Sequence, residues 1–288
     1  TIHPGIDTRN YGASFLPAAH QGTPVRLPSK PTDSPIDFLE DPSTDRDAQR
    51  HRFNLIQRMN RRLLARDASD AQMQGMIDSL ETAFRMQTAA PDLMDISQES
   101  DATKKLYGIG EKATDRNGRA CLLARRLSEA GVRFVQVTVD GWDHHGDIRG
   151  SLPKSCAGSD LPCAALILDL KARGLLDDTL VVWSGEFGRT PWSQDLSRTA
   201  PIEKHGREHQ PESFCAWMAG GGVKRGIMYG ETDEFGFRPV SGKVHLHDLH
   251  ATILHLLGLD HERLTWRHLG RDYRLTDVHG HIVSDILT

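Results

Sequence analysis

The chain has 288 residues, of which 38% are apolar and 26% are charged, a balance typical of folded globular proteins and unlike that of disordered chains. Its net charge of −4 supplies no basic field, so no nucleic-acid partner is expected. No apolar run approaches the roughly 18 residues needed to span a bilayer, so no membrane span is expected either. These properties leave the oligomeric state open.

The first part of the chain predicts an arm followed by helices. Residues 1–43 hold half of the fourteen prolines, which disfavour helix, and they predict an extended proline-rich arm. Apolar residues at three- and four-residue steps predict amphipathic helices over about 45–65 and 70–91, packed as an antiparallel pair. We therefore expect an arm over 1–43 and one domain over 44–288, whose first segment, 44–115, is helical.

Residues 116–288 alternate predicted helices and strands and carry the loops that hold metal-ligand residues. Apolar runs rich in β-branched residues predict buried strands at 133–139, 179–184 and 214–219. Helices are predicted at 119–129, 160–174 and 248–258. Because a strand, a helix and a strand in succession almost always give parallel strands, the predicted fold class is α/β, with a mostly parallel sheet flanked by helices. Ligands of such sheets bind beyond the carboxyl ends of the strands, where the loops after 139 and 184 would meet.

The loop after the first predicted strand concentrates possible metal ligands. Residues 140–147, Asp-Gly-Trp-Asp-His-His-Gly-Asp, hold three carboxylates and two imidazoles. Oxygen donors beside imidazole suit Zn²⁺, Mn²⁺ or a related divalent ion, and a loop lets Asp143 and His145 converge where a strand would splay them. We predict that these two residues bind a metal ion. A solvated turn is the alternative.

The loop after the second predicted strand carries a further candidate pair. Glu186 follows the strand directly and predicts a metal ligand or a general base. Arg189 offers a planar fork suited to an anionic substrate. The alternative is an ion pair between Glu186 and Arg189 that closes a turn on the surface.

Two histidines four residues apart follow in the segment His-Gly-Arg-Glu-His. His205 and His209 have the order His-x-x-Glu-His of one class of metalloprotease. That motif needs a helix, whereas Gly206 and Pro211 predict a loop, so a protease is not the favoured interpretation. The loop offers a further metal ligand, with a pair of surface histidines as the alternative.

Four more histidines surround a helix start at Asp248. They are His245, His247, His250 and His255. Asp248 is expected to cap the helix, and most of these histidines are expected to be exposed.

Taken in order, several motifs resemble the bacterial domain-of-unknown-function 1501 family, whose members are sulfatase-like proteins of the alkaline phosphatase superfamily. The motifs are Gly-Trp-Asp-His-His, Gly-Glu-Phe-Gly-Arg-Thr-Pro, Gly-Arg-Glu-His-Gln-Pro, Ala-Gly-Gly-Gly-Val-Lys and His-Asp-Leu-His-Ala-Thr-Ile-Leu-His-Leu-Leu-Gly. The resemblance covers most of the chain. It implies an α/β sandwich of the alkaline phosphatase and sulfatase type, and an exported protein with a periplasmic or extracellular location.

The resemblance also implies a set of metal ligands. Asp143 and His145 resemble the middle metal motif of the superfamily. His209, with His205 as its rival, resembles the late metal-binding histidine. Glu186 stands at a further ligand position. The cofactor implied is a divalent ion, Zn²⁺, Mn²⁺ or Ca²⁺.

The function that the resemblance implies is metal-dependent hydrolysis of sulfate or phosphate esters, with Arg189 as the catalytic residue that clamps the ester anion. Related hydrolases usually carry Asp followed by His where this chain has Glu186 and Phe187. Their first metal-binding Asp and their nucleophile belong to a segment with no counterpart before Thr1, so the chain resembles the carboxyl-terminal part of a longer protein whose N-terminal part is missing.

Two other functions are compatible with the same motifs. The first is a catalytically silent sulfatase-like protein that binds or assembles anionic glycans. The second is an incomplete product that cannot close its sheet, for which exposed edge strands and poor solubility are expected.

Overall fold

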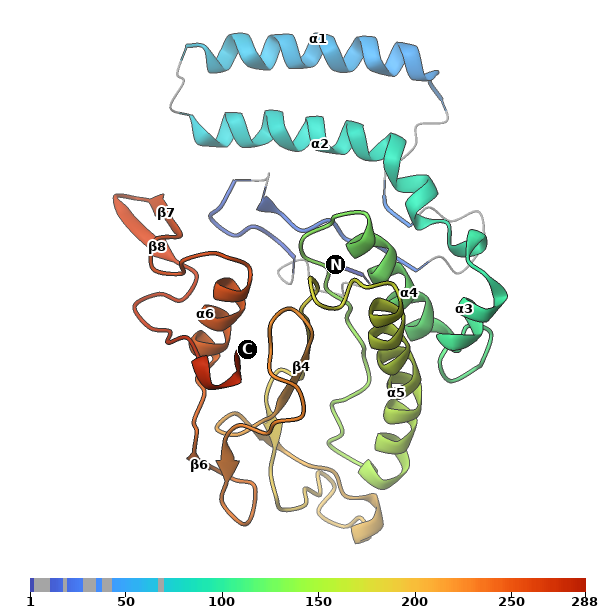
Figure 1. The fold of residues 1–288 in the computed structure, drawn as a ribbon, viewed down its shortest axis with the longest axis vertical. Helices are drawn as coiled ribbons and strands as arrows, with labels where there is room; N and C mark the ends of the chain where they lie inside the picture. Colours follow the sequence, from blue (N-terminus) through green and yellow to red (C-terminus); the bar gives the residue numbers. More distant parts are fainter. Residues whose placement is uncertain (3–10, 18–19, 28–34, 38–42, 67–69) are drawn as a thin grey trace. The chain divides into compact units, whose positions relative to one another are not determined.

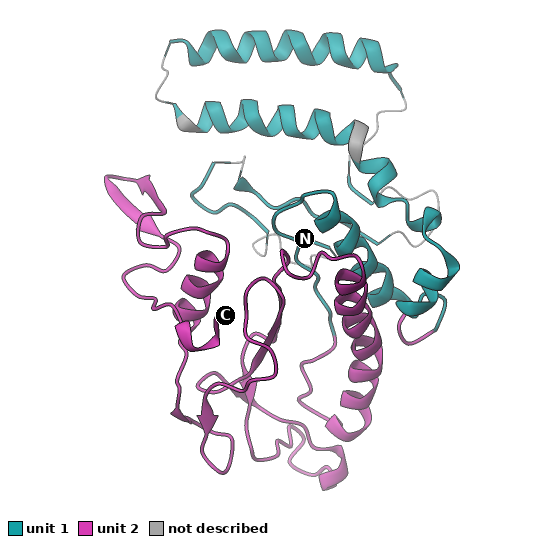
Figure 2. Ribbon diagram, in the orientation of Figure 1, with its two compact units in different colours: residues 1–111, 115–140 teal, residues 112–114, 141–288 magenta. Residues whose placement is uncertain are grey.

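The computed structural model describes residues 1–2, 11–17, 20–27, 35–37, 43–66 and 70–288. These residues form two compact units, residues 1–111 with 115–140 and residues 112–114 with 141–288 (Figure 2). The arm expected over 1–43 lies partly outside the described residues, and the domain boundaries expected from the sequence stay predictions. Within the described ranges, no helix combines the length and the apolar character that crossing a membrane requires.

The first unit is mostly helical (Figure 1). Its helices are α1 (Arg46–Leu64), α2 (Ala71–Met94), the short 3₁₀ helix η3 (Ile96–Gln98), α3 (Asp101–Leu106) and α4 (Asp115–Glu129). The side chain of Asp45 caps α1 by accepting hydrogen bonds from the backbone N–H groups of Asp47 and Ala48. Asp70 caps α2 by accepting from Met73 at 2.9 Å. These caps satisfy donors that a helix start leaves without an internal partner.

Helices α1 and α2 pack side by side and run in opposite directions (Figure 1). Phe53 stacks on Phe84 with ring centroids 4.6 Å apart. Further along α1, the Gln57 side chain donates to the carbonyl of Ile77 at 3.0 Å. From Phe53 to Gln57 the residue number rises along α1, while that of the contacting residue in α2 falls from Phe84 to Ile77. The predicted antiparallel pair is therefore confirmed.

The strand predicted over 133–139 is absent. In this segment only Val137 forms a β-bridge, an isolated parallel one with Ile2, and Phe134 is 74% exposed. The buried partner Ile2 belongs to the core of this unit, together with Val25 and residues of α4. An apolar, β-branched run predicts an extended backbone, but it does not supply a neighbouring strand.

The second unit consists of helices and short strands joined by long loops (Figure 1). Its helices are α5 (Ile148–Ala172), η4 (Ile202–Lys204), α6 (Leu246–Leu256) and η5 (Ser284–Ile286). Its strands are β1 (Val181–Ser184), β2 (Gly188–Arg189), β3 (His209–Gln210), β4 (Ala216–Ala219), β5 (Glu231–Thr232), β6 (Pro239–Ser241), β7 (Thr265–His268) and β8 (Arg271–Arg274).

The predicted α/β fold with a mostly parallel sheet is wrong. Every sheet within the described ranges is a two-stranded antiparallel pair: β1 with β4, β2 with β3, β5 with β6 and β7 with β8. The predicted strands at 179–184 and 214–219 do form, as β1 and β4, with Trp183 opposite Trp217. They run antiparallel because the chain between them returns through loops and the three-residue helix η4, with no crossover helix. Since 133–139 contributes only the single bridge to Ile2, the described residues contain no strand-helix-strand unit of the alkaline phosphatase and sulfatase-like sandwich.

Candidate metal site

Three segments of the second unit meet at the candidate site: residues 142–148, 188–194 and 204–210. The last of these bonds to both of the others. Its backbone hydrogen bonds include Arg207 N to His144 O at 2.9 Å, Asp147 N to Lys204 O at 2.7 Å and Gly206 N to Gln194 O at 2.9 Å. Such hydrogen bonds fix the position of each loop relative to the next. The fold therefore builds the site from backbone pairing between loops.

Two glycines allow this close approach. A Cβ on Gly206 would overlap the backbone of His145 and Gly146, and one on Gly188 would overlap the carbonyl of Ser213. Any other residue would push these loops apart, because real Cβ atoms do not come so close to backbone atoms. Gly206 thus determines how closely the 204–210 segment can approach the loop that carries Asp143.

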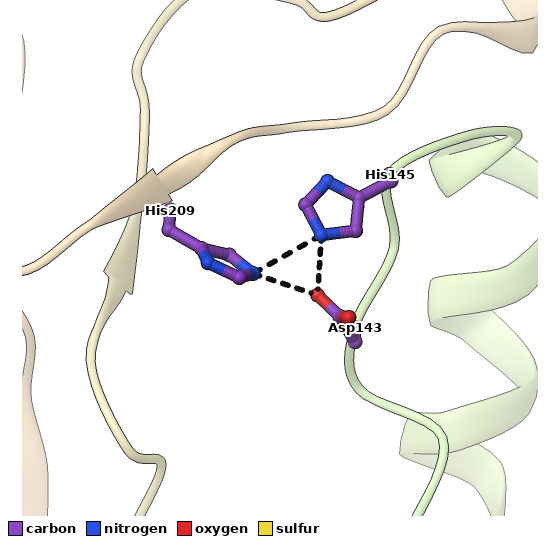
Figure 3. A group of neighbouring side chains, drawn as sticks. All are labelled: Asp143, His145 and His209. Carbon is purple, nitrogen blue, oxygen red and sulfur yellow. Dashed lines mark hydrogen bonds and ion pairs between the residues drawn. The ribbon is translucent and has the colours of Figure 1, made fainter. Parts of the chain in front are cut away.

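Asp143, His145 and His209 converge through one atom each (Figure 3). His145 Nε2 lies 2.9 Å from Asp143 Oδ1, and His209 Nε2 lies 3.0 Å from the same oxygen. The two Nε2 atoms are 3.1 Å apart. Asp143 and His145 come from the loop before α5, and His209 comes from β3. We call these three residues the triad.

Two neighbouring side chains determine which nitrogen of His145 carries its proton. The amide nitrogen of Gln194 donates to a carboxylate oxygen of Glu208. This leaves Gln194 Oε1 facing His145 Nδ1 at 2.8 Å. Because an amide oxygen only accepts, Nδ1 carries the proton, and Nε2 of a neutral His145 presents a lone pair to the triad. Histidines that bind metals in proteins are commonly held in this way through their second nitrogen.

The triad is rich in acceptors. Asp143 Oδ1 and His145 Nε2 both present lone pairs across 2.9 Å, and that contact is favourable only with a positive charge or a proton between them. Hydrogen bonds from His209 and Arg189 lower the pKa of Asp143 to about 2, so this carboxyl is ionised near neutral pH. Its side chain is 61% exposed, and an ion in solution can therefore reach it.

The donor set fits a transition-metal ion. Two imidazole nitrogens and one carboxylate oxygen are the ligands of many zinc sites that keep a fourth position open. The separations of 2.9, 3.0 and 3.1 Å are slightly below about 3.3 Å, the spacing of ligands around a tetrahedral ion with bonds of roughly 2.0–2.1 Å. Ca²⁺ prefers an all-oxygen shell, so Zn²⁺ or Mn²⁺ fits these residues better.

Arg189 lies beside the triad and is held by two carboxylates. Its Nη1 donates to Asp143 Oδ1 at 2.6 Å, and its Nη2 donates to Glu186 Oε1 at 2.9 Å. The Arg189 side chain is 22% exposed, and the central carbon of its guanidinium lies 5.7 Å from the centroid of the Phe187 ring. A fixed cation of this shape is suited to an anion that already lies near the triad.

The comparison with protein families assigns the chain to one of them. The family model described as "Protein of unknown function (DUF1501)" matches residues 1–287. The chain belongs to the DUF1501 family. No curated protein and no solved structure matches it. The match spans nearly the whole chain, so the expectation that the chain corresponds to only the carboxyl-terminal part of the family is not supported, and the match carries no relation to sulfatases or alkaline phosphatases.

The structure of this DUF1501 protein separates the predicted site residues. It brings Asp143, His145 and His209 together, with Arg189 next to them. Glu186 bonds to Arg189 and lies outside the triad, in the ion pair named as the alternative from sequence.

His205 also lies outside the triad. Its Nδ1 contacts Ser193 Oγ at 3.2 Å and its Nε2 contacts the carbonyl of Ala200 at 3.0 Å. The backbone of His205 pairs with Gly146 in the loop that carries Asp143 and His145, but of the two histidines that the sequence offered only His209 brings a side-chain nitrogen to those residues.

Three neighbours of the triad were not predicted. They are Gln194 and Glu208, which orient His145, and Phe187, whose ring centroid lies 4.6 Å from that of His209. Glu208 had a weak signal, because it precedes His209 in the His-x-x-Glu-His order. The sequence carries no signal for Gln194, because a single amide side chain in a polar loop stands at no characteristic spacing from the metal-ligand residues.

Proposed function

We propose that this chain is a divalent-metal-dependent hydrolase of sulfate or phosphate esters. The observation that carries the proposal is the convergence of the triad beside Arg189, which donates to the same Asp143 oxygen that both histidines approach. The resemblance of the loop motifs to sulfatase-like proteins supports the same class of reaction. Since the sheets of the described residues are all antiparallel pairs, the proposal depends on the chemistry of this site and not on the fold.

Each residue has a role in the proposed reaction, which adds water across the ester bond and releases an alcohol and the free anion. Asp143, His145 and His209 would hold the ion, Zn²⁺ or Mn²⁺. When bound, it would supply a Lewis acid to stabilise negative charge on the group being transferred. Arg189 pairs through its planar guanidinium with oxygens of the sulfate or phosphate group. Glu186 holds the other edge of the guanidinium and so positions it.

The metal content of the purified chain tests the site without a known substrate. After loading with Zn²⁺ and removal of the excess, we expect about one ion per chain in the wild type, and none in Asp143→Ala or His209→Ala. His205→Ala is the matched control, because His205 lies four residues from His209 and has its own partners. Zinc retained by both triad variants would contradict the assignment, as would zinc lost from the control.

Turnover is tested separately with 4-nitrophenyl sulfate and 4-nitrophenyl phosphate. We expect zinc-loaded wild type to release nitrophenol from one of them, and chelator-treated protein and His209→Ala to release none. Zinc binding without turnover would contradict hydrolysis. It would support instead a catalytically silent protein that binds anionic glycans.

We also propose that the protein is exported, to the periplasm or the cell exterior, on the resemblance of its motifs alone. Fractionation of cells that express the natural gene product tests this location. Recovery in the cytoplasm would contradict it.

A further inference from the structure

A second feature of the second unit is a hollow lined by aromatic side chains. It is an open hollow of about 340 Å³ lined by Pro191, Trp192, Asp233, Phe235 and Phe237. Trp192 is 56% exposed and Phe235 is 69% exposed. Large aromatic side chains gathered at the surface expose apolar area that folding normally buries, and such patches commonly mark binding sites. We call this set the aromatic hollow.

The aromatic hollow has a defined shape. Asp233 holds the turn that carries two of its rings, because its carboxylate accepts from the backbone N–H groups of Phe235, Phe237 and Arg238 at 3.2, 2.8 and 3.1 Å. The rings of Trp192 and Phe237 lie 5.2 Å apart and are tilted by 43°. Since the carboxylate of Asp233 is occupied by the backbone N–H groups of the residues that follow it in the turn, the wall that faces a ligand is mainly apolar.

The aromatic hollow is connected to the candidate metal site on both sides. The side chain of Gln210, next to His209, donates to the carbonyl of Phe237 at 2.9 Å. Trp192 follows Arg189 by three residues, so their Cα atoms lie at most about 11 Å apart. Both walls of the hollow are therefore tied to residues adjacent to the triad or to Arg189.

We propose that the aromatic hollow binds a sugar ring of a sulfated or phosphorylated glycan whose anionic group lies at Arg189 and the triad. A pyranose presents C–H groups of slight positive charge to the negative face of an aromatic ring, while its hydroxyls stay in water. The exposed, tilted rings suit such an amphipathic ligand. A planar aromatic group would instead favour two parallel rings. The inference rests on the proposed function for the anion, and it adds the substrate class.

The separation of charge and apolar surface supports a ligand with two parts. The lining residues of the hollow include no cation, although the Arg238 guanidinium lies 5.3 Å from the centroid of the Phe237 ring; Arg189 lies beside the triad. A free sulfate or phosphate ion would engage only Arg189 and the triad. A sugar that carries the anion would engage both regions, because Trp192 of the hollow follows Arg189 by only three residues.

The test uses the indole N–H signal of Trp192 in an NMR spectrum of the zinc-loaded chain, identified by its disappearance in Trp192→Phe. Probes are tetrasaccharides of heparin, chondroitin sulfate and carrageenan, together with their desulfated forms and inorganic sulfate. We expect at least one backbone type to shift the signal in both forms, with the sulfated form binding about tenfold more tightly.

Variants locate the sugar. We expect Trp192→Ala and Phe235→Ala to weaken binding of both forms about tenfold, with zinc content unchanged. Because Trp192→Ala lacks the indole signal, its binding is measured by calorimetry. Phe134→Ala, which removes an exposed ring of the first unit, is the matched control and should bind normally.

The two proposals fail in different ways. If zinc binds and no tetrasaccharide shifts the Trp192 signal, or if the two ring variants bind normally, the sugar site is wrong and the metal site stands. A tighter response to 4-nitrophenyl sulfate than to every sulfated tetrasaccharide would also overturn the sugar site. If desulfated probes bind and sulfation adds nothing, the sugar site stands and the anion-binding role of Arg189 and the triad is wrong.

Discussion

Two groups of histidines in the second unit differ in how they use their nitrogens. In the triad, His145 and His209 direct one nitrogen each toward a single carboxylate oxygen. Near the start of α6, His245, His247 and His279 meet by ring contact, with His247 and His279 stacked 5.4 Å apart. Both groups are dense in imidazole, but only the triad brings ligand atoms together.

The reason lies in helix capping. His245 Nδ1 accepts from the backbone N–H of His247 at 3.2 Å, and Asp248 accepts from the backbone N–H groups of His245 and His281 at 2.8 Å each. The nearby carboxylate and one imidazole are therefore occupied by backbone donors. Histidine density alone does not make a metal site. His247 Nδ1 is also left without a hydrogen-bond partner, but among the described residues it joins no cluster of three ligand atoms, whereas the ligand atoms of the triad converge.

The largest effect is expected when the backbone of the triad is forced apart. Gly206→Ala should lower the free energy of unfolding by about 2–3 kcal/mol and abolish zinc binding, because its Cβ would overlap the backbone of His145. Gly146→Ala is the matched control, since its Cβ would meet nothing closer than the carbonyl of Lys204 at 3.8 Å. Urea denaturation and zinc content measure both effects. Equal behaviour of the two variants would contradict the role of Gly206.

Removal of one histidine from each group tests the difference between them directly. Zinc at a hundredfold excess over its dissociation constant should stabilise the wild type by about 2.7 kcal/mol. His209→Ala should lose this stabilisation and His247→Ala should keep it. Thermal unfolding with and without zinc measures the shift. Loss of the shift in His247→Ala would show that zinc binds at the histidines near α6, and it would contradict the assignment to the triad.

A smaller effect is expected from the residues that orient His145. Gln194→Ala removes the acceptor for the Nδ1 proton, so zinc affinity should fall about 10- to 100-fold. Ser193→Ala is the control, because Ser193 contacts His205 and not the triad. Competition with a chelating dye measures both dissociation constants. An unchanged affinity in Gln194→Ala would show that this hydrogen bond does not set the tautomer.

The smallest effect belongs to the α6 group. Asp248→Ala should destabilise the chain by about 1 kcal/mol and leave zinc binding intact. Burial raises the pKa of Asp248, but the hydrogen bonds from the backbone of His245 and His281 outweigh burial and hold it below the usual 3.8. A lowered pKa stabilises the fold above about pH 4, and the benefit is lost as the pH falls through the folded-state value. The difference between wild type and variant should therefore shrink in acid, and a difference that grew would contradict this sign.

The paired helices α1 and α2 were predictable from sequence because their signals are local, whereas α5 begins at Ile148 and not at the predicted residue 160. The apolar spacing of α1 and α2 and the caps Asp45 and Asp70 act within a few residues. The sheet was not predictable, because pairing depends on a distant partner. Residues 133–139 have strand composition, but they meet only Ile2 at a single bridge.

The candidate site was predictable in part for the same reason. Asp143, His145 and His209 were identified by residue type and by their place in loops. The preference for His209 over His205 comes from the backbone bonds around Gly206, which no spacing in the sequence encodes. Gln194 lies 49 residues from His145, and its role is visible only once both loops are folded.

The most direct test of the central claim is X-ray absorption spectroscopy of the zinc-loaded chain. The account predicts nitrogen and oxygen ligands at about 2.0–2.1 Å, with the scattering of two imidazoles in the wild type and no bound zinc in His209→Ala. Sulfur ligands at about 2.3 Å in the wild type, or zinc retained in His209→Ala with the same two-imidazole scattering, would contradict it.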